Sequence, residues 1–118
     1  MAFKKTIALD FDGVIHKYTS KWIAEEIIPD GPVEGIKEFI DDLNKTYRVV
    51  IYSARAKTEK GKNAIKKWLK ENDIAIEKIY YEKPMAFVYI DDRAIRFDGN
   101  INGLKEQIDN FEPWNKKR

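Results

Sequence analysis

Two pairs of acidic residues each follow a short apolar stretch of the sequence. Asp10 and Asp12 close the first stretch, and Asp91 with Asp92 closes a later one. Residues two apart on a strand point to the same side, so Asp10 and Asp12 leave the strand end together. Carboxylate oxygens without histidine or cysteine are the ligands that Mg²⁺ prefers. The sequence therefore predicts a Mg²⁺ site formed by these four residues.

Three further polar residues lie next to apolar stretches and suit a phosphate group. Ser53 offers a hydroxyl donor, and Arg55 and Lys83 offer two cations. Mg²⁺ and cationic side chains neutralise a phosphate ester, so that a carboxylate can attack phosphorus. A second carboxylate beside the first can hold a proton for the leaving alcohol. Acids and cations together indicate phosphoryl transfer.

The stretches between these residues alternate between strand and helix patterns. Strands are expected over 6–11, 47–53, 78–81 and 86–90, with a short fifth strand at 95–97. Helices are expected over 33–45, from Thr58 to about Asn72, and around 101–111. This order predicts a Rossmann-like open parallel α/β sheet with helices on both faces. Ligands of such sheets bind at the carboxyl ends of the strands, where the polar residues lie.

Length and composition bound the class of protein. The chain has 118 residues, 43% hydrophobic and 36% charged, which predicts a single domain over residues 1–118. It has no cysteine and one histidine, His16, which excludes disulfide scaffolds, thiolate nucleophiles and multi-histidine metal sites. No run of 18 or more apolar residues occurs, so we expect no membrane partner and a cytoplasmic location.

The charge is unevenly distributed along the chain. Between Arg55 and Lys70 there are seven Lys or Arg residues and one Glu, although the whole chain carries only +2. A basic helix at about 58–72 either steers an anion such as nucleic acid or is a solvated helix face. The sequence leaves these alternatives, and the oligomeric state, open.

The ordered set of four motifs resembles the haloacid dehalogenase-like phosphatase superfamily. ALDFDGVI resembles its first motif, IYSAR its second, Lys83-Pro84 its third and VYIDD its fourth. The resemblance covers about residues 5–99. It implies a phosphomonoester hydrolase with Mg²⁺ as cofactor, a phosphate ester as substrate and an aspartyl-phosphate intermediate.

The resemblance also implies a role for each motif residue. Asp10 would be the nucleophile and a metal ligand, and Asp12 the general acid/base, with its backbone carbonyl on the metal. Asp91 would bind the metal directly, and Asp92 would bind it through water or orient its neighbours. The residues that would bind the transferring group are Ser53 and Lys83. Arg55 lies outside the minimal motif set; we expect it on phosphate or substrate, or paired with a structural acid.

The spacing of the motifs leaves no room for the cap domain that covers the site in many members of that superfamily. Only 40 residues separate Asp12 from Ser53, and 29 separate Ser53 from Lys83. A short flap at about 15–28 would be the only local lid, and about 112–118 would form a C-terminal tail. An open site admits a nucleotide, a sugar phosphate or a polynucleotide end. The alternatives are a non-catalytic phosphate or nucleic-acid binding module and a phosphotransferase with the same intermediate.

Several residues in this region have two possible roles. Ser53 could cap a helix instead of binding phosphate. Tyr18 and Trp22 in the flap could stack on a base or sugar, or cover the core. His16 is either a flap residue without chemistry or a substrate contact.

Overall fold

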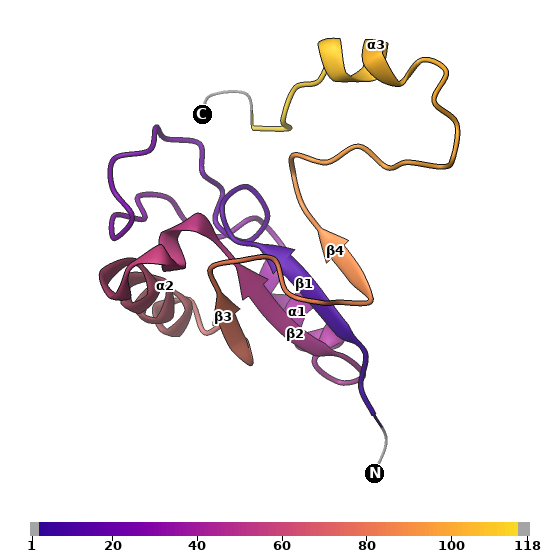
Figure 1. Cartoon of the computed structure of the whole chain (residues 1–118). Coiled ribbons are helices and arrows are strands. Elements are labelled where there is room, and N and C mark those ends of the chain that lie inside the picture. The colour runs from indigo at the N-terminus through magenta and orange to yellow at the C-terminus, as the bar shows by residue number, and fades with distance from the viewer. Residues whose placement is uncertain (1–2, 116–118) are drawn as a thin grey trace.

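The described part of the chain, residues 3–115 of the computed structural model, is an α/β structure built on one parallel sheet (Figure 1). Its four strands have the order β3-β2-β1-β4. The strands are β1 (Thr6–Asp10), β2 (Arg48–Tyr52), β3 (Lys78–Tyr80) and β4 (Val88–Ile90). The helices are α1 (Ile36–Leu43), α2 (Glu59–Glu71), α3 (Leu104–Asp109) and a 3₁₀ helix at Ala54–Lys57.

The main core lies on one face of the sheet, beneath both α1 and α2. Alternate residues of the strands, such as Leu9 and Ile51, are fully buried there. They share one cluster with Ile40 of α1 and with Ile65 of α2. Each helix presents its apolar stripe to that face, which is the usual driving force for such packing. Trp68 of α2 belongs to the same core and is 7% exposed.

The opposite face of the sheet carries no helix of this core, so the predicted placement of helices on both faces is wrong. Ala8, Val50 and Tyr52 form a small second cluster on that face, with Tyr80 and Ala86 packed against it. The β3–β4 connection covers them, running across the front of β1 on the side away from α1 (Figure 1). Residues 81–87 of this connection contain a proline and are too few for a helix that spans the sheet.

The ends of the expected elements agree with the structure in some places and not in others. Thr58 caps α2 as expected, because its hydroxyl accepts a hydrogen bond of 3.0 Å from the Gly61 backbone N–H. The last predicted helix is confirmed in a shorter form, as α3. The fifth strand predicted at 95–97 is wrong, because the chain leaves the sheet after β4 and those residues have no strand partner.

The segment after β4 departs from the sheet and returns to the flap near the end of the chain. Residues 93–113, here called the C-terminal arm, include α3, which has no buried residue (Figure 1). Asn115 then anchors the chain, since its Nδ2 donates to the carbonyls of Lys17 at 2.8 Å and Tyr18 at 2.9 Å. Of the predicted tail, residues 116–118 lie outside the described residues. Within residues 3–115, none of the helices has the length and apolar character needed to cross a membrane.

Candidate functional site

Three carboxylates meet at the carboxyl edge of the sheet. Asp10 ends β1 and Asp91 follows β4, and the parallel pairing of Leu9 with Ile90 places the two aspartates side by side. One carboxylate oxygen each from Asp10, Asp91 and Asp92 lies within 4.8 Å of the others. Such a set of hard oxygen donors fits a divalent cation and offers no ligand that favours zinc or copper.

The electrostatics of Asp10 show how closely these acids crowd one another. Burial, the negative charge of Asp91 and the contact with Asp92 raise the pKa of Asp10 from 3.8 to about 8. Its Oδ1 accepts a hydrogen bond of 2.9 Å from the Phe11 backbone N–H, which fixes the direction of the carboxylate. A bound cation would offset the repulsion among these carboxylates, since its positive charge favours the ionised form of Asp10.

Asp91 is held in its charged form by neighbours that sequence reasoning missed. Burial opposes its ionisation, but the Tyr52 hydroxyl donates to its Oδ2 at 2.7 Å and the Arg93 backbone N–H donates to its Oδ1 at 2.9 Å. These bonds, with the charge of Lys83, lower the pKa of Asp91. Burial and the bond to Asp91 raise the pKa of Tyr52. Strand pairing could have indicated the contact of Tyr52 with the acids, because Tyr52 pairs with Asp10 and lies on the same face of the sheet.

The carboxylate of Asp12 lies outside this three-acid group and has partners of its own. Arg55 Nε lies 3.1 Å from Asp12 Oδ1 and 2.9 Å from Oδ2. His16 Nδ1 lies 2.8 Å from Oδ1. The four predicted metal residues therefore divide into a cluster of Asp10, Asp91 and Asp92, and a separate Asp12 carboxylate bound by a cation and an imidazole.

The hydrogen bonds of His16 define which ring nitrogen carries the proton. The Asp30 backbone N–H donates to Nε2 at 3.0 Å, so Nε2 is the acceptor and Nδ1 carries the hydrogen. Nδ1–H therefore donates to Asp12. Asp30 is itself fixed, because its carboxylate accepts from the backbone N–H groups of Thr19 and Ser20. Burial of Asp30 is outweighed by these bonds, which lower its pKa.

Arg55 lies under the flap and is fully buried. Its Nη1 donates to three flap carbonyls, those of Ala24 at 3.0 Å, Glu25 at 3.0 Å and Ile27 at 2.8 Å. The Trp22 ring covers the guanidinium, with its centroid 4.4 Å from Cζ. Arg55 thus joins Asp12 to the flap. Two roles were expected of it, pairing with an acid and contact with phosphate or substrate. The structure contains the first, and the second stays a prediction.

The two remaining predicted phosphate ligands are Ser53, at the end of β2, and Lys83, whose Nζ lies near the rings of both Tyr52 and Tyr89. Ser53 follows β2 and is 4% exposed; its hydroxyl oxygen accepts from the Arg55 backbone N–H at 3.1 Å and so caps the 3₁₀ helix. Its own hydroxyl hydrogen can still point elsewhere. Lys83, in the β3–β4 connection, places Nζ 4.5 Å from the centroid of the Tyr89 ring, near enough to the acids to lower the pKa of Asp91.

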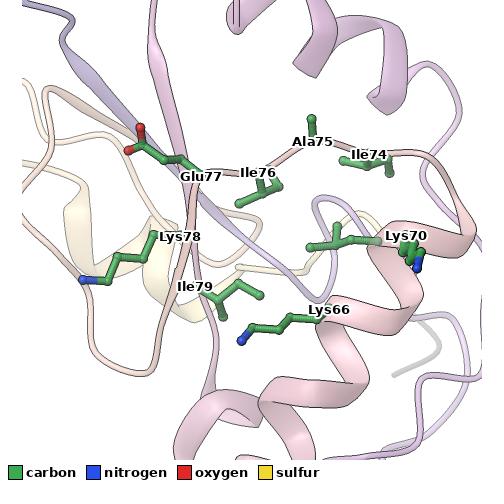
Figure 2. A pocket seen from close by; sticks show the side chains of 9 residues that line it. Lys66, Lys70, Ile74, Ala75, Ile76, Glu77, Lys78 and Ile79 are labelled. Atoms are coloured by element: carbon green, nitrogen blue, oxygen red, sulfur yellow. The ribbon is translucent and has the colours of Figure 1, made fainter.

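A separate hollow of about 280 Å³ lies far from these residues, between the end of α2 and the start of β3 (Figure 2). Lys66, Lys70 and Lys78 line it together with isoleucines that precede or begin β3. Because it adjoins the amino end of a strand, it lies at the opposite edge of the sheet from the acids. It plays no part in the site.

Comparisons with known proteins identify no relative of this chain. No model of a protein family matches it, and searches of curated proteins and of solved structures give no match either.

Proposed function

We propose that this protein is a Mg²⁺-dependent phosphomonoester hydrolase that acts through a phosphorylated Asp10. The observation that carries the proposal is the approach of Asp10, Asp91 and Asp92 to within 4.8 Å at the carboxyl edge of a parallel sheet. The four motifs that resemble haloacid dehalogenase-like phosphatases support the same assignment. Lys83 supports it further, because its charge acts on Asp91.

The proposed reaction has two steps, and Asp10 and Asp12 take part in both. Asp10 attacks phosphorus, so that a carboxylate O–P bond forms, the ester O–P bond breaks and the leaving oxygen takes a proton from Asp12. A water molecule then attacks phosphorus, gives its proton to Asp12 and releases inorganic phosphate and the Asp10 carboxylate. Bound Mg²⁺ would neutralise charge on the phosphoryl group and align it with the nucleophile. Asp10, Asp91 and Asp92 would hold the ion.

The position of Asp12 sets a condition on this scheme. Arg55 and His16 both donate hydrogen bonds to the Asp12 carboxylate, which accepts a proton from water in the second step of this scheme. The first step needs a proton on Asp12. Oδ1 accepts from both Arg55 Nε and His16 Nδ1, whereas Oδ2 accepts from Arg55 Nε, so Oδ2 is the oxygen with more room for that proton.

The test is Mg²⁺-dependent release of phosphate from p-nitrophenyl phosphate. Asp10→Asn should abolish turnover, because an amide is not a nucleophile toward phosphorus. Asp42→Asn, which changes a well-exposed acid on α1, serves as the matched control and should retain the activity. Turnover that survives Asp10→Asn, or that does not need a divalent cation, would overturn the proposal.

The partners of Asp12 also favour a second candidate, a binding module that holds phosphate without hydrolysing it. Asp12 forms an ion pair with the buried Arg55 and accepts a hydrogen bond from His16, and a purely structural aspartate can have the same partners. This alternative predicts that the wild-type protein binds Mg²⁺ and inorganic phosphate but turns over none of a panel of aryl, sugar and nucleotide phosphates. Any Mg²⁺-dependent turnover abolished by Asp10→Asn excludes it.

A further inference from the structure

A cavity of about 350 Å³ lies between the flap and the C-terminal arm. The residues that line it come from three separate parts of the chain: Tyr18, Arg93, Phe111 and Pro113. Its volume falls within the range of about 300–1,000 Å³ that is typical of small-molecule sites. The C-terminal arm, which carries none of the four sequence motifs, supplies three of the four lining residues.

Two hydrogen bonds at or beside the arm residues that line the cavity lead to the proposed active site. The backbone N–H of Arg93 donates to Asp91 Oδ1 at 2.9 Å. Next to Pro113, Trp114 Nε1 donates to the carbonyl of Gly13 at 2.6 Å, directly after Asp12 in the chain. The cavity therefore adjoins the acidic cluster on the side of the C-terminal arm.

The flap wall is joined to the same site through His16. The Tyr18 ring centroid lies 6.0 Å from that of His16, which donates to Asp12. Tyr18 has a backbone φ of 53°, a region that is unfavourable for an aromatic residue. The Asn115 side chain holds its carbonyl in place at 2.9 Å. The structure thus maintains an unfavourable backbone conformation at a residue that lines the cavity.

The chemistry of the lining is aromatic and cationic. Tyr18 and Phe111 offer two ring surfaces, and Arg93 adds a planar guanidinium. Arg93 is exposed, and the ion pairs among residues 3–115 do not include it. Aromatic faces and a guanidinium stack on planar rings, and the guanidinium also donates hydrogen bonds to ring oxygens and nitrogens.

We propose that this cavity binds the leaving group of the substrate and that the leaving group is a nucleoside, so that the substrate is a nucleoside monophosphate. The inference rests on the proposed phosphatase function and deepens it. The flap and the C-terminal arm together form the wall that a cap domain would otherwise provide. A cavity of this size accommodates one planar ring system beside the phosphoryl site, which favours a mononucleotide over a longer strand.

The first test measures substrate selectivity. The ratio of kcat/KM for adenosine and uridine 5′-monophosphates to kcat/KM for glycerol 3-phosphate is determined for wild-type protein and variants. Arg93→Gln and Phe111→Leu should each lower this ratio about tenfold, as expected when one good contact to the leaving group is lost. Arg96→Gln and Phe97→Leu, exposed residues of the same arm that do not line the cavity, should leave it unchanged. A ratio unaltered by Arg93→Gln and Phe111→Leu would overturn the proposal.

A second test separates this proposal from the proposed catalytic function. Asp10→Asn protein, which should not turn over, is titrated with adenosine and with uridine by calorimetry. Binding of either nucleoside should persist in Asp10→Asn and be lost when Arg93→Gln is added. If this holds while wild-type protein hydrolyses no ester, the phosphatase proposal fails and the nucleoside site stands. If esters are hydrolysed but neither nucleoside binds, the nucleoside site fails alone. A phosphorylated oligonucleotide preferred over both mononucleotides would also overturn it.

Discussion

Arg55 and Asp12 form an ion pair in which Nε lies 2.9 Å from Oδ2 and the arginine is fully buried. The same guanidinium donates to three flap carbonyls, so one side chain of the 3₁₀ helix binds both the flap and Asp12, two residues beyond β1. A buried cation with this many partners is costly to replace, because each partner then loses its donor. The pair therefore supports the fold of the flap as well as the position of Asp12.

We expect Arg55→Gln to lower the free energy of unfolding by about 3–5 kcal/mol, the range for breaking a buried ion pair. Asp12 would lose its cation, and the carbonyls of the flap would lose their common donor. Urea denaturation measures the change, and Lys57→Gln, an exposed cation on the same short helix, is the control. A loss no greater than that of the control would show that Arg55 does not hold the flap.

The meeting of Asp10 with Asp91 and Asp92 could be predicted from sequence because it depends only on topology. Apolar stretches that end in acids indicate parallel strands, and the carboxyl ends of parallel strands share one edge. The distances confirm that these three acids share that edge. No finer knowledge of side chains was needed for this part of the site.

The partners of Asp12 could not be predicted in the same way. Arg55 lies 43 residues away in the chain, and its choice between a phosphate and an acid depends on where the flap folds. Periodicity also cannot say on which face of the sheet a helix packs. α1 and α2 share one face, and the other is crossed by the β3–β4 connection because that segment is too short for a helix.

Gly61→Ala should destabilise the protein, although alanine normally stabilises a helix relative to glycine by about 1 kcal/mol. A Cβ at this position would lie 1.9 Å from the Arg55 carbonyl oxygen, so α2 or the 3₁₀ helix would have to move. We expect a loss of about 1–3 kcal/mol in the free energy of unfolding. Gly31→Ala, where a Cβ meets nothing within 4 Å, is the control and should have little effect. An equal or favourable effect at Gly61 would contradict this packing.

The tautomer of His16 can be observed directly, because it is the only histidine in the chain. The Asp30 N–H occupies Nε2, so we expect the Nδ1–H form in long-range ¹H–¹⁵N spectra of the neutral imidazole. The Asp12→Asn variant provides the comparison: the Asp30 N–H still occupies Nε2 there, so the Nδ1–H form should persist with the side-chain amide oxygen as its acceptor. A wild-type spectrum with the hydrogen on Nε2 would contradict the predicted hydrogen-bond network between Asp12 and Asp30.

The raised pKa of Asp10 predicts how pH, stability and Mg²⁺ are linked. Without a cation, the unfolded chain ionises Asp10 above its usual pKa of 3.8, whereas the folded protein retains the proton up to about 8. The unfolded state therefore binds fewer protons in this window, so the contribution of Asp10 to stability is complete below 3.8 and is lost as the pH rises to about 8. Asp10→Asn should remove this part of the pH dependence. Urea denaturation of both proteins without Mg²⁺, over this pH range, measures the contribution of Asp10 as the difference between their free energies of unfolding.

Mg²⁺ should oppose the same loss, because the cation requires the Asp10 carboxylate. Calorimetric titration in buffers of different ionisation enthalpy should show release of about one proton on Mg²⁺ binding near pH 6 and almost none near pH 9. The stabilisation at a fixed Mg²⁺ concentration should accordingly be greater at the higher pH. Asp10→Asn should show neither the proton release nor its pH dependence. Equal proton release at both pH values in wild-type protein would mean that Asp10 does not bind the ion.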